Sequence, residues 1–169
     1  SPDGEQIAAI VNTDEMEFTV CVNGQPWENT FEKAWSLTFL PDGRLVVLAA
    51  NDEEWTVYID DTAWENRFDY IWDLQWSDDG SHIAAAVQKD MVYGMVVDDA
   101  LWENMYENMT CPVLDNSGAS AAVVQKDPLG QGDIESFRQG IFRSAVNGTL
   151  LKPQFVHIWA LRFDSQGRP

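Results

Sequence analysis

The stretch WENTFEKAWSLTFLPDG at residues 27–43 returns almost unchanged as WENRFDYIWDLQWSDDG at residues 64–80. A near-duplicate of this length, with tryptophans at matched positions, indicates an internal repeat, and the period of a repeat sets the architecture of the chain. The glycine that ends each stretch recurs five times, at intervals of 39, 37, 38 and 49 residues: Gly4, Gly43, Gly80, Gly118 and Gly167. The chain therefore contains four periods.

Each period opens with a segment in which apolar and polar residues alternate. Residues 35–39 read WSLTF, and residues 72–76 and 159–163 read WDLQW and WALRF. Alternation with a period of two is typical of a half-buried β-strand and not of a helix. We expect one face of this strand to carry the large side chains, including Trp35, Leu37 and Phe39.

The segments that follow predict three further strands. Residues 45–50, 83–87 and 121–125 are continuously apolar, as in a central strand covered on both faces, and their alanines predict close approach between sheets. A third, alternating strand at residues 55–60 ends in Asp-Asp, a turn signal. A fourth, shorter strand is expected to hold Trp-Glu-Asn.

Four short antiparallel strands in every unit are the signature of a β-propeller blade, because one such blade cannot bury both faces alone. We therefore predict an all-β fold, a single β-propeller or propeller fragment over residues 1–169. The expected blades cover approximately residues 1–34, 35–71, 72–109 and 110–156, with 157–169 starting or completing a further blade. Two alternatives stay open: residues 157–164 pair with residues 5–31 and close the ring, or the four blades belong to a longer array.

Composition limits the partners. The chain has 169 residues, 45% of them hydrophobic, and a net charge of −18 with a pI near 4.1. This charge repels phosphate backbones and anionic lipid headgroups, so nucleic acid and a membrane surface are poor partners. No apolar run is long enough to span a bilayer, which predicts a soluble protein. Cys21 and Cys111 are too few for a disulfide framework and are expected to be structural thiols.

No catalytic, cofactor or metal site is expected. His82 and His157 have no His, Cys or carboxylate at metal-ligand spacing. The paired acids lie in predicted turns, where Asp accepts backbone hydrogen bonds. Glycine-rich phosphate loops and the nucleophile elbow of hydrolases do not occur in the sequence. The prediction is therefore a protein that is not an enzyme.

The Trp-Glu-Asn triplets allow more than one interpretation. They begin at Trp27, Trp64 and Trp102 and place an aromatic face beside an acid and an amide. Lectins use that combination to stack on a sugar ring, so a carbohydrate-binding propeller is the alternative function. The favoured interpretation is packing between blades, and an intermediate one is stacking on a protein partner, since tryptophan is enriched in interface hot spots.

A second candidate site is an insertion. The last period exceeds the one before it by 11 residues, placed near residues 128–140. Long loops on a rigid scaffold often carry binding functions, and this one presents an aromatic ring and a fork-shaped donor, Phe137 and Arg138. Two interpretations stay open: partner contacts through these side chains, or an insertion that the surface tolerates without a function.

The alternation of Pro-Asp-Gly turns, Trp-Thr-Val strands and Trp-Glu-Asn segments resembles the tryptophan-rich WD40-like repeat proteins. Among them it is most similar to the soluble D subunits of the Tmc transmembrane redox complex of sulfate-reducing bacteria. The resemblance covers essentially the whole chain at the level of the repeat. In the second half Thr110 and Pro112 replace Trp35 and Leu37, and residues 151–153 read LKP where WEN is expected.

This resemblance implies a cofactor-free, non-catalytic scaffold subunit of a membrane-associated electron-transfer complex. Its expected partners are haem and iron–sulfur protein subunits. The implied location is cytoplasmic, at the periphery of the inner membrane, reached through partner subunits and without direct insertion. No catalytic residues come with the family.

Overall fold

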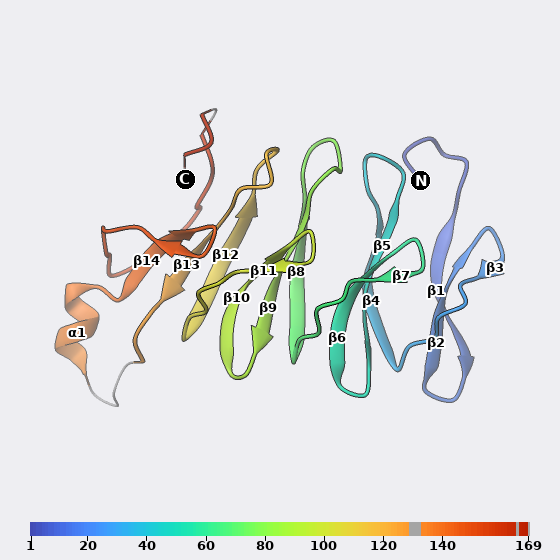
Figure 1. The fold of residues 1–169 in the computed structure, drawn as a ribbon, viewed down its shortest axis with the longest axis horizontal. Coiled ribbons are helices and arrows are strands. Elements are labelled where there is room, and N and C mark those ends of the chain that lie inside the picture. Colours follow the sequence, from blue (N-terminus) through green and yellow to red (C-terminus); the bar gives the residue numbers. More distant parts are fainter. Residues whose placement is uncertain (129–132, 165, 169) are drawn as a thin grey trace.

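The chain folds into four small antiparallel β-sheets that stand side by side in the order of the sequence (Figure 1). The computed structural model describes residues 1–128, 133–164 and 166–168. Within each sheet the strands are neighbours in the same order as in the chain. The all-β class is confirmed, and the sheets follow one another in a propeller-like arrangement. We number them sheet 1 to sheet 4 from the N-terminus.

Sheet 1 has three strands: β1 (Ala8–Asp14), β2 (Glu17–Val22) and β3 (Gln25–Pro26). Sheet 2 has four: β4 (Lys33–Phe39), β5 (Leu45–Asn51), β6 (Glu54–Ile59) and β7 (Thr62–Ala63). Sheet 3 consists of β8 (Tyr70–Trp76), β9 (Ile83–Lys89), β10 (Val92–Val97) and β11 (Ala100–Leu101). Sheet 4 consists of β12 (Asn108–Leu114), β13 (Ser120–Gln125), β14 (Phe142–Val146) and β15 (Thr149–Leu150).

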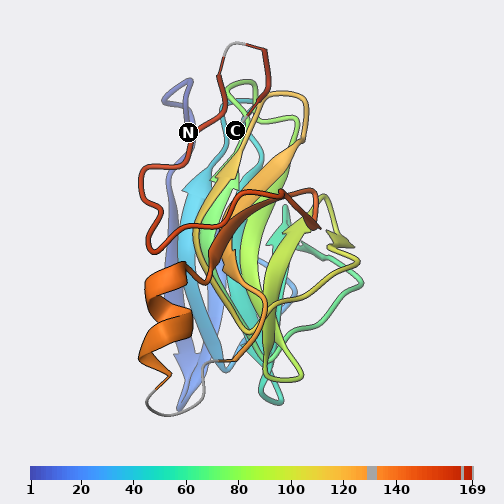
Figure 2. The same ribbon diagram turned by 90° about the vertical axis from the view of Figure 1, so that its left-hand side faces the viewer.

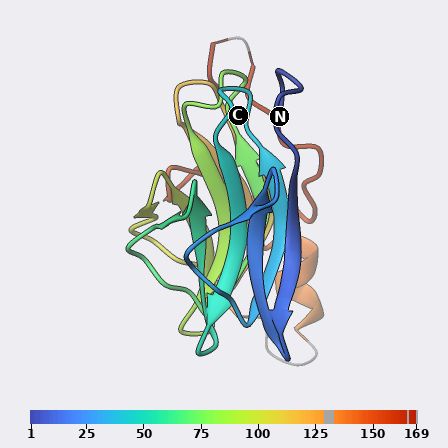
Figure 3. The same cartoon turned by 90° about the vertical axis from the view of Figure 1, so that its right-hand side faces the viewer.

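The core lies between the sheets, in one hydrophobic cluster for each pair of neighbours. The second strands of the two inner sheets, β5 and β9, each contribute to two clusters. In β5, Leu45 and Val47 pack against sheet 1, whereas Val46 and Leu48 pack against sheet 3. The predicted central strands are therefore confirmed, because the continuous apolar run serves both faces. Figures 2 and 3 view the row from its two ends and show the sheets one behind another.

The first strands of sheets 2, 3 and 4 depart from simple alternation because each contains a β-bulge. In β4 the register shifts between Trp35 and Thr38, and the extra residue, Ser36, has a φ of 55°. The bulge turns Trp35 toward sheet 3, while Leu37 and Phe39 point toward sheet 1. The expectation that these three side chains share one face was wrong.

The short fourth strands lie just before Trp-Glu-Asn and do not contain it. β7 and β11 end one residue before Trp64 and Trp102, so the triplet forms a turn after the strand. The chain then returns to the third strand through an isolated bridge between two aromatic residues, as in Trp55 with Phe68. The predicted place of the triplet was therefore wrong by a few residues. Equivalent bridges join Phe18 to Phe31, Tyr93 to Tyr106 and Phe142 to Phe155.

Sheets 1 and 4 lie at opposite ends of the row (Figure 1). Residues 157–163 form no strand, and residues 162–164 line a cleft of about 650 Å³ with residues 113–117 of sheet 4 and its turn. The alternative in which residues 157–164 pair with residues 5–31 is not observed. Ala160 nevertheless has a φ of 55°, the conformation of the bulge residue Ser36. This segment therefore keeps the backbone of a first strand without a partner strand.

The insertion contains the one helix of the described residues, α1 (Ile134–Gln139). Asp133 caps it by accepting a hydrogen bond from the backbone N–H of Ser136 at 3.0 Å. Residues 129–132 of the predicted insertion lie outside the described part of the chain. The sequence predicts a loop over residues 128–140, whereas residues 134–139 of this segment form a helix of six residues.

Candidate functional site

The Trp-Glu-Asn turns lie between sheets. Trp64 and Trp102 retain only 9% and 6% of their exposure, and Trp27 is half-buried. Trp64 packs in the cluster between sheets 2 and 3, and the indole N–H of Trp102 donates to Ser120 Oγ at 2.8 Å. The indoles at 64 and 102 therefore serve inter-sheet packing and leave no open face on which a sugar ring stacks.

Aspartates of the following sheet hold these turns in place. The Asp61 carboxylate accepts hydrogen bonds from the backbone N–H groups of Glu28, at 2.7 Å, and Asn29, at 3.3 Å. In return, the Asn29 side-chain amide donates to the Asp61 carbonyl at 2.9 Å. Asp99 of sheet 3 makes the same set of contacts with the next turn. We call these the inter-sheet Asp contacts, and they explain why Asn follows Trp-Glu in the motif.

The last junction uses a different acceptor. Gly148 stands where Asp61 and Asp99 stand in the earlier sheets, and its carbonyl accepts from the Asn104 amide at 3.1 Å and the Tyr106 hydroxyl at 2.6 Å. Burial raises the pKa of the Tyr106 hydroxyl, which keeps it a neutral donor. The tryptophan turn of sheet 3 is thus held by sheet 4 without a carboxylate.

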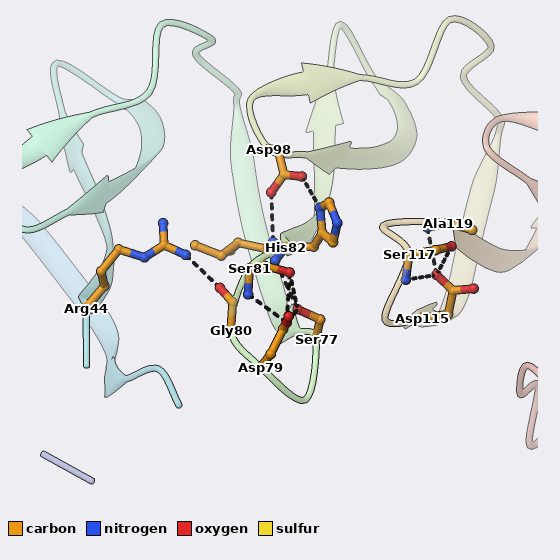
Figure 4. A network of polar contacts seen from close by, with 11 residues as sticks. Arg44, Ser77, Asp79, Gly80, Ser81, His82, Asp98, Asp115, Ser117 and Ala119 are labelled. Carbon is orange, nitrogen blue, oxygen red and sulfur yellow. Dashed lines mark hydrogen bonds and ion pairs between the residues drawn. The ribbon is translucent and has the colours of Figure 1, made fainter. Parts of the chain in front are cut away.

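One end of the row, here called the turn end, is formed by the turns around Gly43, Gly80 and Gly118. Figure 4 shows the turn of Gly80 and its neighbours. The Asp79 carboxylate accepts from the backbone N–H of Ser81, at 3.0 Å, and from the hydroxyls of Ser77 and Ser81. These hydrogen bonds lower the pKa of Asp79 well below its usual value. The turn end is therefore rich in internal polar contacts.

Polar contacts at the turn end also cross between sheets. The Arg44 guanidinium donates to the Gly80 carbonyl at 2.6 Å, and Asn116 donates its amide to Asp78 at 2.7 Å. Within sheet 3, His82 Nδ1 lies 2.7 Å from the Asp98 carboxylate (Figure 4). The Arg44 and Asn116 contacts tie sheets 2, 3 and 4 together, a structural role for these polar side chains.

The other chemically reactive side chains are dispersed. Cys21, in sheet 1, and Cys111, in sheet 4, are both free thiols. His157 packs its ring against Trp159, with centroids 5.1 Å apart. Across the described ranges, no group of three or more His, Cys, Asp and Glu side chains is close enough to hold a metal ion.

The opposite end of the row, here called the hairpin end, consists of the tips of β1–β2, β5–β6 and β9–β10 together with α1 (Figure 1). Several large apolar side chains are exposed there: Met16 (74%), Met91 (79%), Ile134 (62%), Phe137 (44%) and Tyr70 (43%). Acidic residues surround them: Glu15, Glu17, Asp52, Glu53, Glu54, Asp69, Asp90 and Glu135. These side chains are the candidates for an interaction surface at the hairpin end.

The structure places Phe137 and Arg138 on α1, where both are exposed. Beside the helix lies a cleft of about 360 Å³, lined by basic Lys126 and Arg143 and acidic Asp127 and Asp133, among others. Phe137 and Arg138 do not line this cleft. The insertion therefore offers side chains to the hairpin end and does not combine with the distant Trp-Glu-Asn turns into one site.

A second cleft of the hairpin end opens between sheets 2 and 3. It measures about 700 Å³, and three aromatic rings line it: Trp35, Trp55 and Tyr70. Trp35 and Trp55 stack with ring centroids 4.0 Å apart, and Tyr70 meets both edge-on at 5.4 and 5.8 Å. Charged side chains complete the lining: Lys33, Asp52, Glu53, Glu54 and Asp69. We call this site the aromatic cleft.

Inspection of single motifs missed this cleft, although the repeat carries a signal for it. Residues 33, 70 and 108 open the first strands of sheets 2, 3 and 4, and only residue 70 is aromatic. A tyrosine at this point adds a third ring to the Trp35–Trp55 pair of the preceding sheet. Alignment of the periods position by position exposes the difference.

The fold and its two ends define an all-β repeat protein with four antiparallel sheets. Comparison with protein-family models gives no match, and comparison with curated proteins gives none either. In the part of the chain that the structure describes, no helix is long and apolar enough to cross a membrane.

Proposed function

We propose that the four sheets are blades of a β-propeller and that the chain is a non-catalytic docking module whose hairpin end contacts a partner protein. The observation that carries this proposal is the set of exposed apolar side chains at the hairpin end. Met16, Met91 and Phe137 come from three separate segments, and each retains more than two fifths of its exposure. Protein interfaces combine exposed apolar side chains with polar and charged neighbours, as the hairpin tips and α1 do.

The scaffold supports such a role because it is held together at several levels. Buried clusters lie between all neighbouring sheets, and the inter-sheet Asp contacts fix the turns. A rigid scaffold lowers the entropy lost when its loop tips bind. The hairpin tips thus have defined positions before a partner arrives.

The kind of partner follows from the charge and from the resemblance. A net charge of −18 favours a partner with a basic surface. The resemblance to the D subunits of a transmembrane redox complex suggests haem and iron–sulfur subunits. We propose that the chain sits at the membrane periphery by binding these subunits, without a cofactor of its own.

Site-specific crosslinking tests the docking surface. A photoreactive phenylalanine derivative is placed at position 91 or 137, at the hairpin end, and for comparison at Trp76, which is 41% exposed on the far end of β8. We expect one basic partner protein to crosslink from positions 91 and 137 and not from 76. That partner is then purified and its affinity for the chain measured.

Substitutions give the quantitative test with the purified partner. Phe137→Ser and Met91→Ser are each expected to weaken binding by about fivefold or more, since a central apolar contact contributes upward of about 1 kcal/mol. Trp76→Ser serves as the matched control and leaves the affinity unchanged. Equal effects of all three changes, or crosslinks from position 76 alone, contradict docking through the hairpin end.

The carbohydrate alternative retains one of its three sites. Trp64 and Trp102 are buried, and only Trp27 keeps part of its surface open. A sugar panel monitored by tryptophan fluorescence, with Trp27→Phe as the control, tests that remaining position. A response that is lost in Trp27→Phe supports sugar binding, and its absence leaves protein docking as the function.

A further inference from the structure

We infer that the aromatic cleft is a receptor for an arginine side chain of the docking partner. This inference rests on the proposed function and adds the chemistry of one contact. Two sets of groups meet in the cleft: the rings of Trp35, Trp55 and Tyr70, and an excess of carboxylates on the hairpin tip and the adjoining strand ends. Both sets attract cations.

The aromatic rings supply the first attraction. The face of an aromatic ring carries partial negative charge, and a cation near it is stabilised, most strongly by tryptophan. Trp55 is almost fully buried, at 4% exposure, and fixes the position of Trp35 by stacking at 4.0 Å. Tyr70 keeps 43% of its surface exposed. The cleft therefore combines the exposed ring of Tyr70 with a buried tryptophan that holds Trp35 in place.

The carboxylates supply the second attraction. Four acids and one lysine line the cleft, an excess of three negative charges over positive. Asp69 accepts a hydrogen bond from the backbone N–H of Asp90 at 2.8 Å. Among the described residues, the carboxylates of Asp52, Glu53 and Glu54 make no hydrogen bond or ion pair. They are therefore available to a cationic donor.

Arginine suits this combination better than lysine. Its guanidinium is flat and weakly hydrated, stacks on aromatic rings and donates two parallel hydrogen bonds to a carboxylate. The ammonium of lysine is compact and strongly hydrated, and it gains less from a ring face. Lys33 lines the cleft without forming an ion pair within the described part of the chain, so its charge opposes an arriving cation.

The next junction along the row provides a natural comparison. There Trp72 and Tyr93 lie with centroids 6.1 Å apart. Asn108 takes the repeat position of Tyr70, and Met91 and Val92 take those of Glu53 and Glu54. Tyr70 itself stands there at the repeat position of Lys33, with its ring 5.8 Å from that of Trp72, so the number of rings is the same. The junction has two acids fewer, and Tyr93 replaces Trp55, so it is expected to bind a guanidinium more weakly, since tryptophan binds cations best. Selectivity for the aromatic cleft follows from the additional carboxylates and the tryptophan.

The test uses the whole chain and three small probes: N-acetyl-arginine amide, its lysine counterpart, and the citrulline counterpart, which has the shape of arginine without the charge. Binding is followed by the NMR signals of the Trp35 and Trp55 indole N–H groups. We expect saturable shifts with arginine, weaker ones with lysine and none with citrulline. Equal responses to arginine and citrulline, or no response to arginine, overturn the inference.

Four variants locate the binding. Tyr70→Ala and Glu53→Gln are each expected to weaken arginine binding by about two- to fivefold, the scale of an exposed cation–π contact. Lys33→Gln is expected to strengthen it, because one repelling charge is removed. Tyr93→Ala, in the comparison junction, leaves it unchanged. Equal weakening by Tyr70→Ala and Tyr93→Ala contradicts the site.

The arginine-binding test and the crosslinking test can give opposite outcomes, so each proposal can be rejected without the other. If positions 91 and 137 crosslink to a partner while the cleft does not distinguish arginine from citrulline, docking stands and the arginine receptor is wrong. If the probes bind as expected while crosslinking occurs only from position 76, the cleft recognises guanidinium and the proposed docking surface is wrong.

Discussion

At the scale of the residue, single carboxylates join neighbouring sheets. Asp61 and Asp99 each accept backbone hydrogen bonds from the Trp-Glu-Asn turn of the sheet before them. The sequence shows the triplets and the Asp-Asp pairs, yet it does not show that they meet, because about 33 residues separate the partners. Their contact becomes visible only when two sheets are placed side by side.

Asp99→Gly tests one such contact. Asp99 has a φ of 66°, a conformation that glycine adopts without strain, so the substitution removes the carboxylate and adds no backbone strain. Loss of the charge-assisted hydrogen bonds to Glu65 and Asn66 outweighs the backbone relief that glycine brings at positive φ, and the net effect is expected to lower the free energy of unfolding by about 1–2 kcal/mol. Urea denaturation measures it, with Glu65→Ala, a charge removed from the same turn, as the control. A loss no larger than that of the control contradicts the role of Asp99.

Asp79 predicts a pH dependence at the same scale. Hydrogen bonds from Ser81 and Ser77 lower its pKa in the folded chain below the ordinary value of 3.8. A lowered folded pKa gives stability that is fully present above pH 3.8 and is lost as the pH falls from there through the folded value. In Asp79→Asn, stability should fall less across this acid range than in the parent chain. Parallel urea titrations at neutral and acid pH measure the difference, and equal acid sensitivity contradicts it.

At the scale of the element, the first strand shows where sequence reasoning stops. The alternating pattern of residues 35–39 correctly predicts a strand, but a bulge residue with positive φ follows the first aromatic position. This residue is Ser36, Asp73 or Cys111 in the three sheets. None of them is glycine, so the residue type does not indicate the positive φ of the bulge. The apolar second strands were predictable because burial on both faces leaves a compositional mark.

The bulge predicts a stabilising change. Ser36 is exposed and has a φ of 55°, a conformation that costs a non-glycine residue about 1–2 kcal/mol. Ser36→Gly removes this cost at the expense of chain entropy in the unfolded state, so a net gain of about 0.5–1 kcal/mol is expected. Thr38→Gly, two residues further along the same strand, is expected to destabilise. Thermal unfolding measures the stability of both variants. A lower stability of Ser36→Gly than of the parent chain contradicts a backbone cost at Ser36.

At the scale of the whole molecule, stability comes from contacts between successive sheets. Ala84 and Ala86 of β9 face sheet 4, and Ala85 faces sheet 2, all three fully buried. These small side chains permit the close approach that the sequence predicted. The aromatic cleft was less predictable, because it combines rings from two sheets and depends on a single difference between repeats at Tyr70.

Overpacking tests the close approach. Ala85→Leu adds three carbon atoms to a filled junction and is expected to lower the free energy of unfolding by about 1–3 kcal/mol. Ala9→Leu places the same side chain on an exposed position of β1 and is expected to change stability by less than about 0.5 kcal/mol. Chemical denaturation compares the two. Similar tolerance at both positions contradicts tight packing between sheets 2 and 3.

The inter-sheet Asp contacts all run in one direction, from a sheet to the turn of its predecessor. During synthesis on the ribosome, the tryptophan turn of sheet 1 therefore emerges before Asp61, and that of sheet 2 before Asp99. About one further repeat must be translated before the Asp carboxylate that accepts hydrogen bonds from each of these turns is present. During assembly from the N-terminal end, the tryptophan turns of sheets 1 and 2 are therefore each stabilised only after the following sheet has been synthesised.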